Sequence, residues 1–212
     1  MKIIRQKLVP GISERNLSIE IYKLALNMGC NELSFSPIVA FGKHSAIPHH
    51  RITDRQLKKE DIALIDLGVK YQGYCSDITR TFFMSPPNTK QTNMYNLVAD
   101  TLDAAVSAMS ADVLASKIYK TVYRIFKKQN IQDLFIHAAG HGVGIAIHET
   151  PSLSLKNKQK LYENEVTTIE PGLYYKNFGG IRLENMILVK KERGLILNKL
   201  PIDFDFAIIR QQ

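Results

Sequence analysis

The chain has 212 residues, 45% of them hydrophobic, and a net charge of +8. This length and apolar content favour a single globular domain with a real core. No apolar run approaches the roughly 20 residues that span a bilayer, and the first residues are too polar for a secretory signal. The basic pairs are scattered and lack interleaved aromatic residues, which argues against nucleic-acid binding. We therefore expect a cytoplasmic protein that does not bind membranes.

The first half of the chain predicts one helix followed by strands. Ser13 can cap a helix whose apolar residues recur every three or four positions as far as Met28, and Gly29 would end it. Residues 33–41 are typical of a strand, residues 62–67 of a buried strand, and residues 77–83 of a strand with alternating polarity. A turn near residues 71–73 would join the last two.

The second half repeats this order. Helices are predicted over residues 89–109 and after Ala111, where Leu114, Ile118, Val122 and Ile125 recur at helical spacing. Residues 135–147 contain glycines between histidines and do not favour a helix. Residues 166–169, 173–175 and 181–189 are typical of strands. The two similar halves hint at a duplication, and helices packed on a curved antiparallel sheet, an α+β fold, fit best.

Two acidic residues of the first half lie in or beside buried strands. Asp66 belongs to the apolar run Ile62–Leu67, where a lone carboxylate must be paired, protonated or bound to metal. It could instead cap the strand end near Gly68. Asp77 opens the next strand, and an intervening turn would place both carboxylates on one face. A divalent cation between them would remove their repulsion.

The second half supplies matching groups. His141 lies among the glycines of residues 140–144, and Glu170 follows the strand of residues 166–169. Glu184 lies two residues after Arg182, so the two side chains would share a face of a strand. Four carboxylates and one imidazole make an oxygen-rich site, which suits Mn²⁺, Fe²⁺ or Co²⁺ better than a sulfur-rich zinc site does. The two cysteines, Cys30 and Cys75, lie in no zinc pattern and are expected to be free thiols.

The order of these motifs resembles the pita-bread metallopeptidases, peptidase family M24. The stretch from Asp66 to Phe82, Asp-Leu-Gly-x-x-Tyr-x-Gly-Tyr-x-Ser-Asp-Ile-Thr-Arg-Thr-Phe, is similar to the first signature of that superfamily. Residues 141–151 are similar to the second, residues 168–174 to the third and residues 180–184 to the fourth. The Ser-Asp-Ile-Thr-Arg-Thr sequence and the His-Glu-x-Pro turn resemble the corresponding motifs of the proline-specific branch. The resemblance implies the pita-bread fold, with two halves related by a pseudo-twofold axis.

The resemblance also implies roles for individual residues. Two divalent metal ions would be bound, with Mn²⁺ as the expected ion and Co²⁺, Fe²⁺ and Zn²⁺ as alternatives. Glu170 would shuttle a proton to the leaving nitrogen, and His148 and His49 would contact the substrate carbonyl or the oxyanion. His137 would line the proline pocket, and Arg182 would stabilise the site. If the alignment with the family motif shifts by one residue, His50 takes the role assigned to His49. The expected metal ligands are Asp66, Asp77, His141, Glu170 and Glu184.

The activity implied is hydrolysis of the peptide bond that precedes proline. An Xaa-Pro aminopeptidase acting on peptides with proline in second position is the first interpretation, and a prolidase, which splits Xaa-Pro dipeptides, is the alternative. A non-catalytic binding module of the same fold and a methionine aminopeptidase are further alternatives. Residues 1–212 would form the catalytic domain alone, without the N-terminal domain usual in the family, which leaves a homodimer open.

Overall fold

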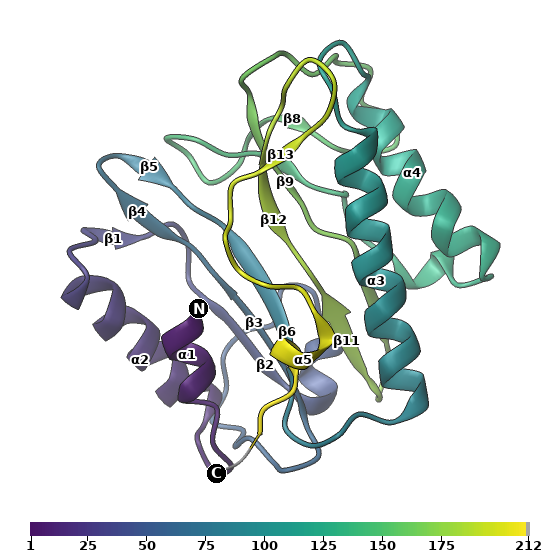
Figure 1. Cartoon of the computed structure of the whole chain (residues 1–212). Coiled ribbons are helices and arrows are strands. Elements are labelled where there is room, and N and C mark those ends of the chain that lie inside the picture. Colours follow the sequence, from purple (N-terminus) through teal and green to yellow (C-terminus); the bar gives the residue numbers. More distant parts are fainter. Residues whose placement is uncertain (211–212) are drawn as a thin grey trace.

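The computed structural model describes residues 1–210, and Figure 1 shows helices packed beside antiparallel strands. The elements of the N-terminal half are α1 (Lys2–Gln6), α2 (Glu14–Asn27), β1 (Glu32–Leu33), β2 (Ile38–Phe41), the 3-10 helix η1 (Gly42–Ala46), β3 (Ile62–Leu67), β4 (Val69–Tyr71), β5 (Tyr74–Cys75) and β6 (Ile78–Phe83). Its strands form two small antiparallel sheets with the orders β2-β3-β6 and β1-β4-β5.

The expected helix and two of the expected strands of this half are confirmed. The Ser13 hydroxyl accepts a hydrogen bond from the amide of Asn16 at 3.1 Å, which caps α2 as predicted. The prediction of one strand over residues 33–41 is wrong, because the chain changes sheets there: β1 pairs with β4, whereas β2 pairs with β3. Pro37 lies at the change and has no amide hydrogen to continue a ladder.

The C-terminal half places two helices before its strands. A five-stranded sheet has the order β13-β12-β9-β7-β8, and β10 pairs with β11. The elements are α3 (Thr89–Ala108), α4 (Ala115–Lys128), the 3-10 helix η2 (Gln132–Leu134), β7 (His141–Gly142), β8 (Glu149–Ser152), β9 (Val166–Ile169), β10 (Gly172–Tyr175), β11 (Gly179–Arg182), β12 (Asn185–Leu188), β13 (Leu195–Ile196) and α5 (Phe204–Ala207). The strand predicted over residues 181–189 is therefore divided between two sheets at residues 183–184.

Each half has its own hydrophobic core. In the first, apolar residues of α1 and α2 such as Ile4 and Leu17 pack against β2, β3 and β6. In the second, residues of α3 and α4 such as Val98 and Phe126 pack against β9 to β12, and Figure 1 shows α3 and α4 side by side next to these strands. Each such buried side chain contributes roughly 1.5 to 3 kcal/mol. The strands of both halves therefore have rigid support beneath them.

The C-terminal segment connects the two halves. Arg80 on β6 is completely buried, and its guanidinium donates to the carbonyl oxygens of Glu184, Leu200 and Pro201. Further along, the amide of Ile209 donates to the carbonyl of Phe83 at 2.9 Å.

Within residues 1–210, no helix combines the length and the apolar character needed to cross a membrane.

Candidate metal centre

One cavity of about 690 Å³ lies where the two halves meet, and it collects every site residue predicted from the sequence. These residues come from loops and strand ends of both halves, which is why no single motif could form the site. They are His49, Asp66, Asp77, His137, His141, His148, Glu170, Arg182 and Glu184.

The two aspartates are brought together by the pairing of β3 with β6. Asp66 lies opposite Thr79 in this antiparallel ladder, and Asp77 immediately precedes β6. Both carboxylates are buried, with 8% of Asp66 and 5% of Asp77 exposed. Arg182 donates to Oδ2 of Asp66 at 2.7 Å, but Oδ1 of Asp66 and Oδ1 of Asp77 have no hydrogen-bond partner among residues 1–210.

The second half contributes one imidazole and two carboxylates. Nε2 of His141 lies 3.5 Å from Oδ2 of Asp77 and 3.7 Å from Oε1 of Glu170. Ligand atoms of Asp77, His141 and Glu184 all lie within 4.8 Å of one another. Nδ1 of His141 is 2.9 Å from the carbonyl oxygen of Gly142 and must carry the proton, because a carbonyl oxygen only accepts. Nε2 therefore presents its lone pair to the carboxylates, as a metal ligand does.

The site has an excess of buried negative charge. Burial and the neighbouring carboxylates of Glu184, Asp66 and Glu170 raise the pKa of Asp77 to about 11. Burial raises the pKa of Glu170 to about 7 and also holds the pKa of Glu184 well above its usual range. When ionised, the four carboxylates and Arg182 would together carry a net charge of −3, counted as four negative and one positive group.

These features fit divalent cations. Two buried carboxylate oxygens without donors are costly unless a cation or proton satisfies them. The donor set of four carboxylates and one imidazole suits hard or borderline ions. The residues that could hold them are Asp66, Asp77, His141, Glu170 and Glu184, all of which line the cavity.

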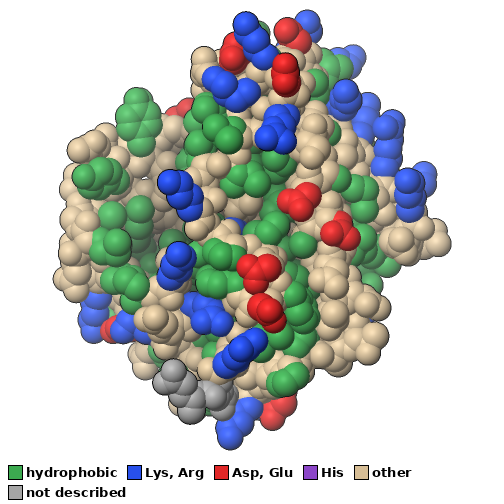
Figure 2. All heavy atoms as spheres, viewed as in Figure 1, with side chains coloured by type: hydrophobic (Ala, Val, Ile, Leu, Met, Phe, Trp, Pro, Cys, Tyr) green, Lys and Arg blue, Asp and Glu red, His purple; other side chains and the backbone are tan. Residues whose placement is uncertain are grey.

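The predicted substrate histidines differ in their surroundings. The rings of His49 and His148 line the cavity at exposed positions, and neither has a hydrogen-bond partner within the described residues. His148 packs edge-on against His141, with ring centroids 4.3 Å apart. Figure 2 shows no histidine side chain on the face seen in Figure 1. The same figure shows Lys and Arg side chains spread over this face.

His137 is half-buried, and both of its ring nitrogens are hydrogen-bonded. Its Nδ1 lies 2.7 Å from the carbonyl oxygen of Ala138 and so carries the proton, and its Nε2 accepts from the hydroxyl of Tyr174 at 2.8 Å. Burial lowers the pKa of His137 to about 3, which keeps the ring neutral. Arg182 in turn donates to the Tyr174 hydroxyl at 2.9 Å. His137 therefore offers the cavity a ring surface rather than a free nitrogen.

Sequence reasoning missed the groups that orient the ligands. The Tyr174 hydroxyl joins Arg182 to His137. Thr79 donates to Oε2 of Glu184 at 2.8 Å and accepts from Nε of Arg182 at 3.1 Å. The available signal was the polar run Thr79-Arg80-Thr81 inside a strand that should be buried.

The fold and the cavity together define an α+β domain with a cluster of candidate metal ligands, and comparisons with known proteins assign its family. Residues 1–191 match the model of metallopeptidase family M24. The chain belongs to this family, and its fold is the pita-bread fold.

Three relatives illustrate the similarity. The Xaa-Pro dipeptidase of Pyrococcus furiosus is 36% identical over 194 residues, which cover 92% of this chain and 56% of that protein. The crystal structure of X-Pro aminopeptidase from Thermotoga maritima has a TM-score of 0.94 at 28% identity and covers 98% of this chain and 58% of that one. The Xaa-Pro dipeptidase from Bacillus anthracis has a TM-score of 0.95 at 31% identity, with coverages of 98% and 58%. The chain thus spans about half the length of the curated relatives it matches.

Proposed function

We propose that this chain is the catalytic domain of a metallopeptidase that cleaves the bond preceding proline, most simply as an Xaa-Pro aminopeptidase. The single observation that carries the proposal is the meeting of four carboxylates and His141 in one cavity with two exposed histidine rings. The proposal extends to residues 1–212 as one domain. It also extends to Mn²⁺ as the ion, because the ligand atoms are mostly hard oxygens.

Asp66, Asp77, His141, Glu170 and Glu184 would hold two such ions. When bound, two divalent ions lower the pKa of water and polarise a carbonyl group. Arg182 fixes Asp66 by donating to Oδ2, and Oδ1 has no hydrogen-bond partner among residues 1–210, so it is available to an ion. Thr79 fixes Glu184 in the same way through Oε2.

The remaining groups act on the peptide. Oε1 of Glu170 is 3.4 Å from the Thr168 hydroxyl, while Oε2 has no hydrogen bond within residues 1–210 and can carry a proton to the leaving imide nitrogen. His49 and His148 have free ring nitrogens at the cavity wall and can donate to the substrate carbonyl and the developing oxyanion. The neutral ring of His137, next to Tyr174, provides a surface on which a proline ring can pack.

A paired peptide assay tests this proposal. The protein, loaded with Mn²⁺ or Co²⁺, is incubated with Xaa-Pro dipeptides, Xaa-Pro-containing tripeptides and Met-Ala-Ser. Cleavage of the tripeptide identifies an aminopeptidase, and cleavage of the dipeptide alone identifies a prolidase. Release of Met without action on Xaa-Pro bonds identifies a methionine aminopeptidase. If the folded, metal-bound protein cleaves none of them, the catalytic proposal fails and a binding module of the same fold remains.

Prolidase activity is the second candidate because the Pyrococcus furiosus and Bacillus anthracis relatives both have the name Xaa-Pro dipeptidase. The two activities share the scissile bond and differ in whether the substrate continues beyond proline. A series of Xaa-Pro peptides with increasing C-terminal length separates them, since a prolidase loses activity as the peptide is extended.

A further inference from the structure

Glu14 is a buried carboxylate that the proposed chemistry does not use. It is the first residue of α2, its side chain is 0% exposed, and five donors surround it. Oε1 accepts from the amide of Phe41 at 3.0 Å and from Nδ1 of His44 at 2.8 Å. Oε2 accepts from Nε2 of His50 at 2.9 Å and from both the amide and the hydroxyl of Thr53.

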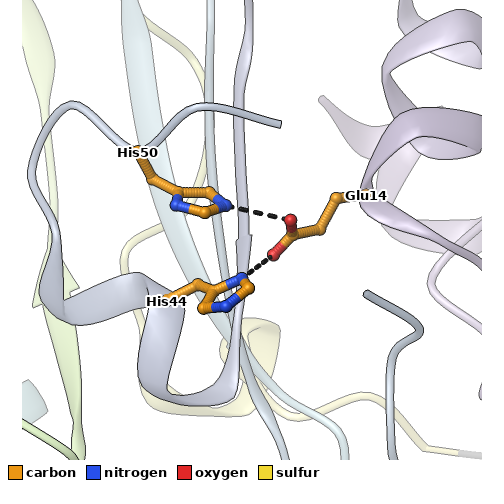
Figure 3. A group of neighbouring side chains, drawn as sticks. All are labelled: Glu14, His44 and His50. Atoms are coloured by element: carbon orange, nitrogen blue, oxygen red, sulfur yellow. Dashed lines mark hydrogen bonds and ion pairs between the residues drawn. The ribbon is translucent and has the colours of Figure 1, made fainter. Parts of the chain in front are cut away.

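Figure 3 shows the arrangement: His44 and His50 approach the carboxylate from one segment, and Glu14 reaches them from α2. Because an ionised carboxylate only accepts hydrogen bonds, Nδ1 of His44 and Nε2 of His50 both carry protons. We call Glu14, His44, His50 and Thr53 the Glu14 cluster.

The Glu14 cluster has the residue types of a metal site, since ligand atoms of Glu14, His44 and His50 lie within 4.8 Å of one another. Its geometry is that of hydrogen bonds instead. The two imidazole nitrogens lie 2.8 and 2.9 Å from the carboxylate oxygens, whereas at the metal centre the nitrogen of His141 lies 3.5 and 3.7 Å from its acidic neighbours. Both oxygens of Glu14 are satisfied, whereas Asp66 and Asp77 each keep an orphan oxygen.

The hydrogen bonds lower the pKa of Glu14 even though burial alone would raise it. This is the opposite of the raised pKa values of Asp77 and Glu170. The carboxylate of Glu14 is therefore stabilised as an anion by protein donors and needs no cation.

The segment held by the Glu14 cluster, residues 41–53, carries His49. Its other side is held by β11: Arg182 donates to the carbonyl of Pro48 at 3.1 Å, and the amide of Gly180 donates to the Ser45 hydroxyl at 2.8 Å. The contact is close, because a Cβ on Gly180 would overlap the carbonyl oxygen of Ser45. The segment is thus fixed between α2 of one half and β11 of the other.

His49 itself has no hydrogen bond from its ring to any described residue, yet both of its neighbours in sequence are anchored. Pro48 is held by Arg182, and His50 is held by Glu14. With the backbone held on each side, His49 is placed at the cavity wall.

We propose that Glu14 is a positioning residue that fixes His49 in the cavity by holding His50. The proposal rests on the proposed peptidase function, in which His49 contacts the substrate. It assigns His50 to the support of His49 rather than to the substrate.

The first experiment is a double-mutant cycle on Xaa-Pro peptide cleavage. Glu14→Gln keeps the shape of the side chain but replaces one carboxylate oxygen, an acceptor, with an amide group that donates. We expect kcat/KM to fall about tenfold, because even a small displacement of His49 from the substrate is costly. In a His49→Ala background, Glu14→Gln should have no further effect. Glu20→Gln is the matched control, because Glu20 lies on the same helix, is partly exposed and pairs only with Lys7 and Lys23, so its substitution should leave cleavage unchanged.

Two further measurements keep the proposal falsifiable if Glu14→Gln folds poorly or the chain proves inactive. His50→Ala should lose activity as Glu14→Gln does, and His50→Gln, which restores a donor toward Glu14, should recover most of it. Hydrogen exchange of Glu14→Gln should accelerate about tenfold over residues 41–53, with the rest of the core unchanged.

The proposal is overturned by any of four results: full activity of Glu14→Gln, an equal loss in the His49→Ala background, no recovery with His50→Gln, or a third bound metal ion that Glu14→Gln removes. Absence of cleavage by the wild type and by Glu20→Gln would refute the peptidase function instead. Hydrogen exchange over residues 41–53 then decides the placement of His49 independently: acceleration supports it, and unchanged exchange refutes it.

Discussion

The raised pKa of Asp77 makes a prediction about the protein without metal. Between the unfolded pKa of 3.8 and the folded pKa of about 11, the folded state binds a proton that the unfolded state has lost. Stability that is present below pH 3.8 is therefore lost progressively as the pH rises through this window. Within this window the free energy of unfolding falls by about 1.4 kcal/mol for each pH unit.

The interval from pH 7 to pH 9 reduces the contribution of other groups, because unfolded histidines are already neutral there and Glu170, with a pKa of about 7, contributes little. Glu184, whose pKa is also raised, would add to the loss from Asp77. Two pH units cost about 2.7 kcal/mol of unfolding free energy from Asp77 alone. For a chain of this size, that lowers Tm by roughly 5 to 11 °C. Saturating Mn²⁺ should abolish the loss, because the ion replaces the proton.

The assay is thermal unfolding in a chelator at pH 7 and pH 9, followed by circular dichroism and repeated with Mn²⁺. Asp77→Asn is the control. Other titrating groups, such as the amino terminus with its lowered pKa, are common to both proteins, so the difference in slope reports Asp77 and its coupling to Glu184. A metal-free protein that is equally stable at both values, or a variant with the same slope as wild type, would refute the reasoning.

Three further substitutions have outcomes set by the structure. Arg80→Met removes the donor to four backbone carbonyl groups, those of Thr79, Glu184, Leu200 and Pro201, and should lower the unfolding free energy by about 3 kcal/mol or more, measured in urea. Gly140, which precedes His141, has a φ of +154°, and a Cβ there would overlap the carbonyl oxygen of Thr168. Gly140→Ala should therefore weaken Mn²⁺ binding about tenfold, measured by calorimetry. Gly29→Ala is the control, because a Cβ at Gly29 meets open space and should leave Mn²⁺ binding unchanged. Phe126→Ala empties a fully buried position and should cost about 3 to 5 kcal/mol in guanidinium unfolding, with unchanged metal stoichiometry.

The sequence predicts the site better than the strands around it. Each ligand lies in a short motif whose residue types and order are visible in the chain, and the structure brings all five predicted ligands to one cavity. Their catalytic roles remain a prediction. The orienting contacts were not predictable, because the pair of Arg182 and Asp66 joins residues 116 positions apart.

Two strand predictions failed where the chain passes from one sheet to another, and the second of these breaks lies at the candidate site. Residues 181–189 have the apolar pattern of one strand, but the chain breaks at Glu184, whose side chain faces the cavity and whose carbonyl oxygen accepts from Arg80. The local pattern of apolar residues contains no information on either of these two contacts of Glu184. Glu14 was overlooked for a similar reason: an acidic residue in a first helical turn is ordinarily an exposed partner of the helix dipole, and its real partners lie 27 to 39 residues away.

The bonds made by Arg80 impose an order on biosynthesis. Its carbonyl acceptors at Leu200 and Pro201 lie 120 and 121 residues later in the chain. At ribosomal rates of about 5 to 20 residues per second, Arg80 is synthesised roughly 6 to 24 s before those acceptors exist. Until then the nascent N-terminal half must leave this cation hydrated. Glu184 also follows Arg80 by 104 residues, so neither the complete core around Arg80 nor the candidate metal cavity can form before residues 184–201 have been synthesised.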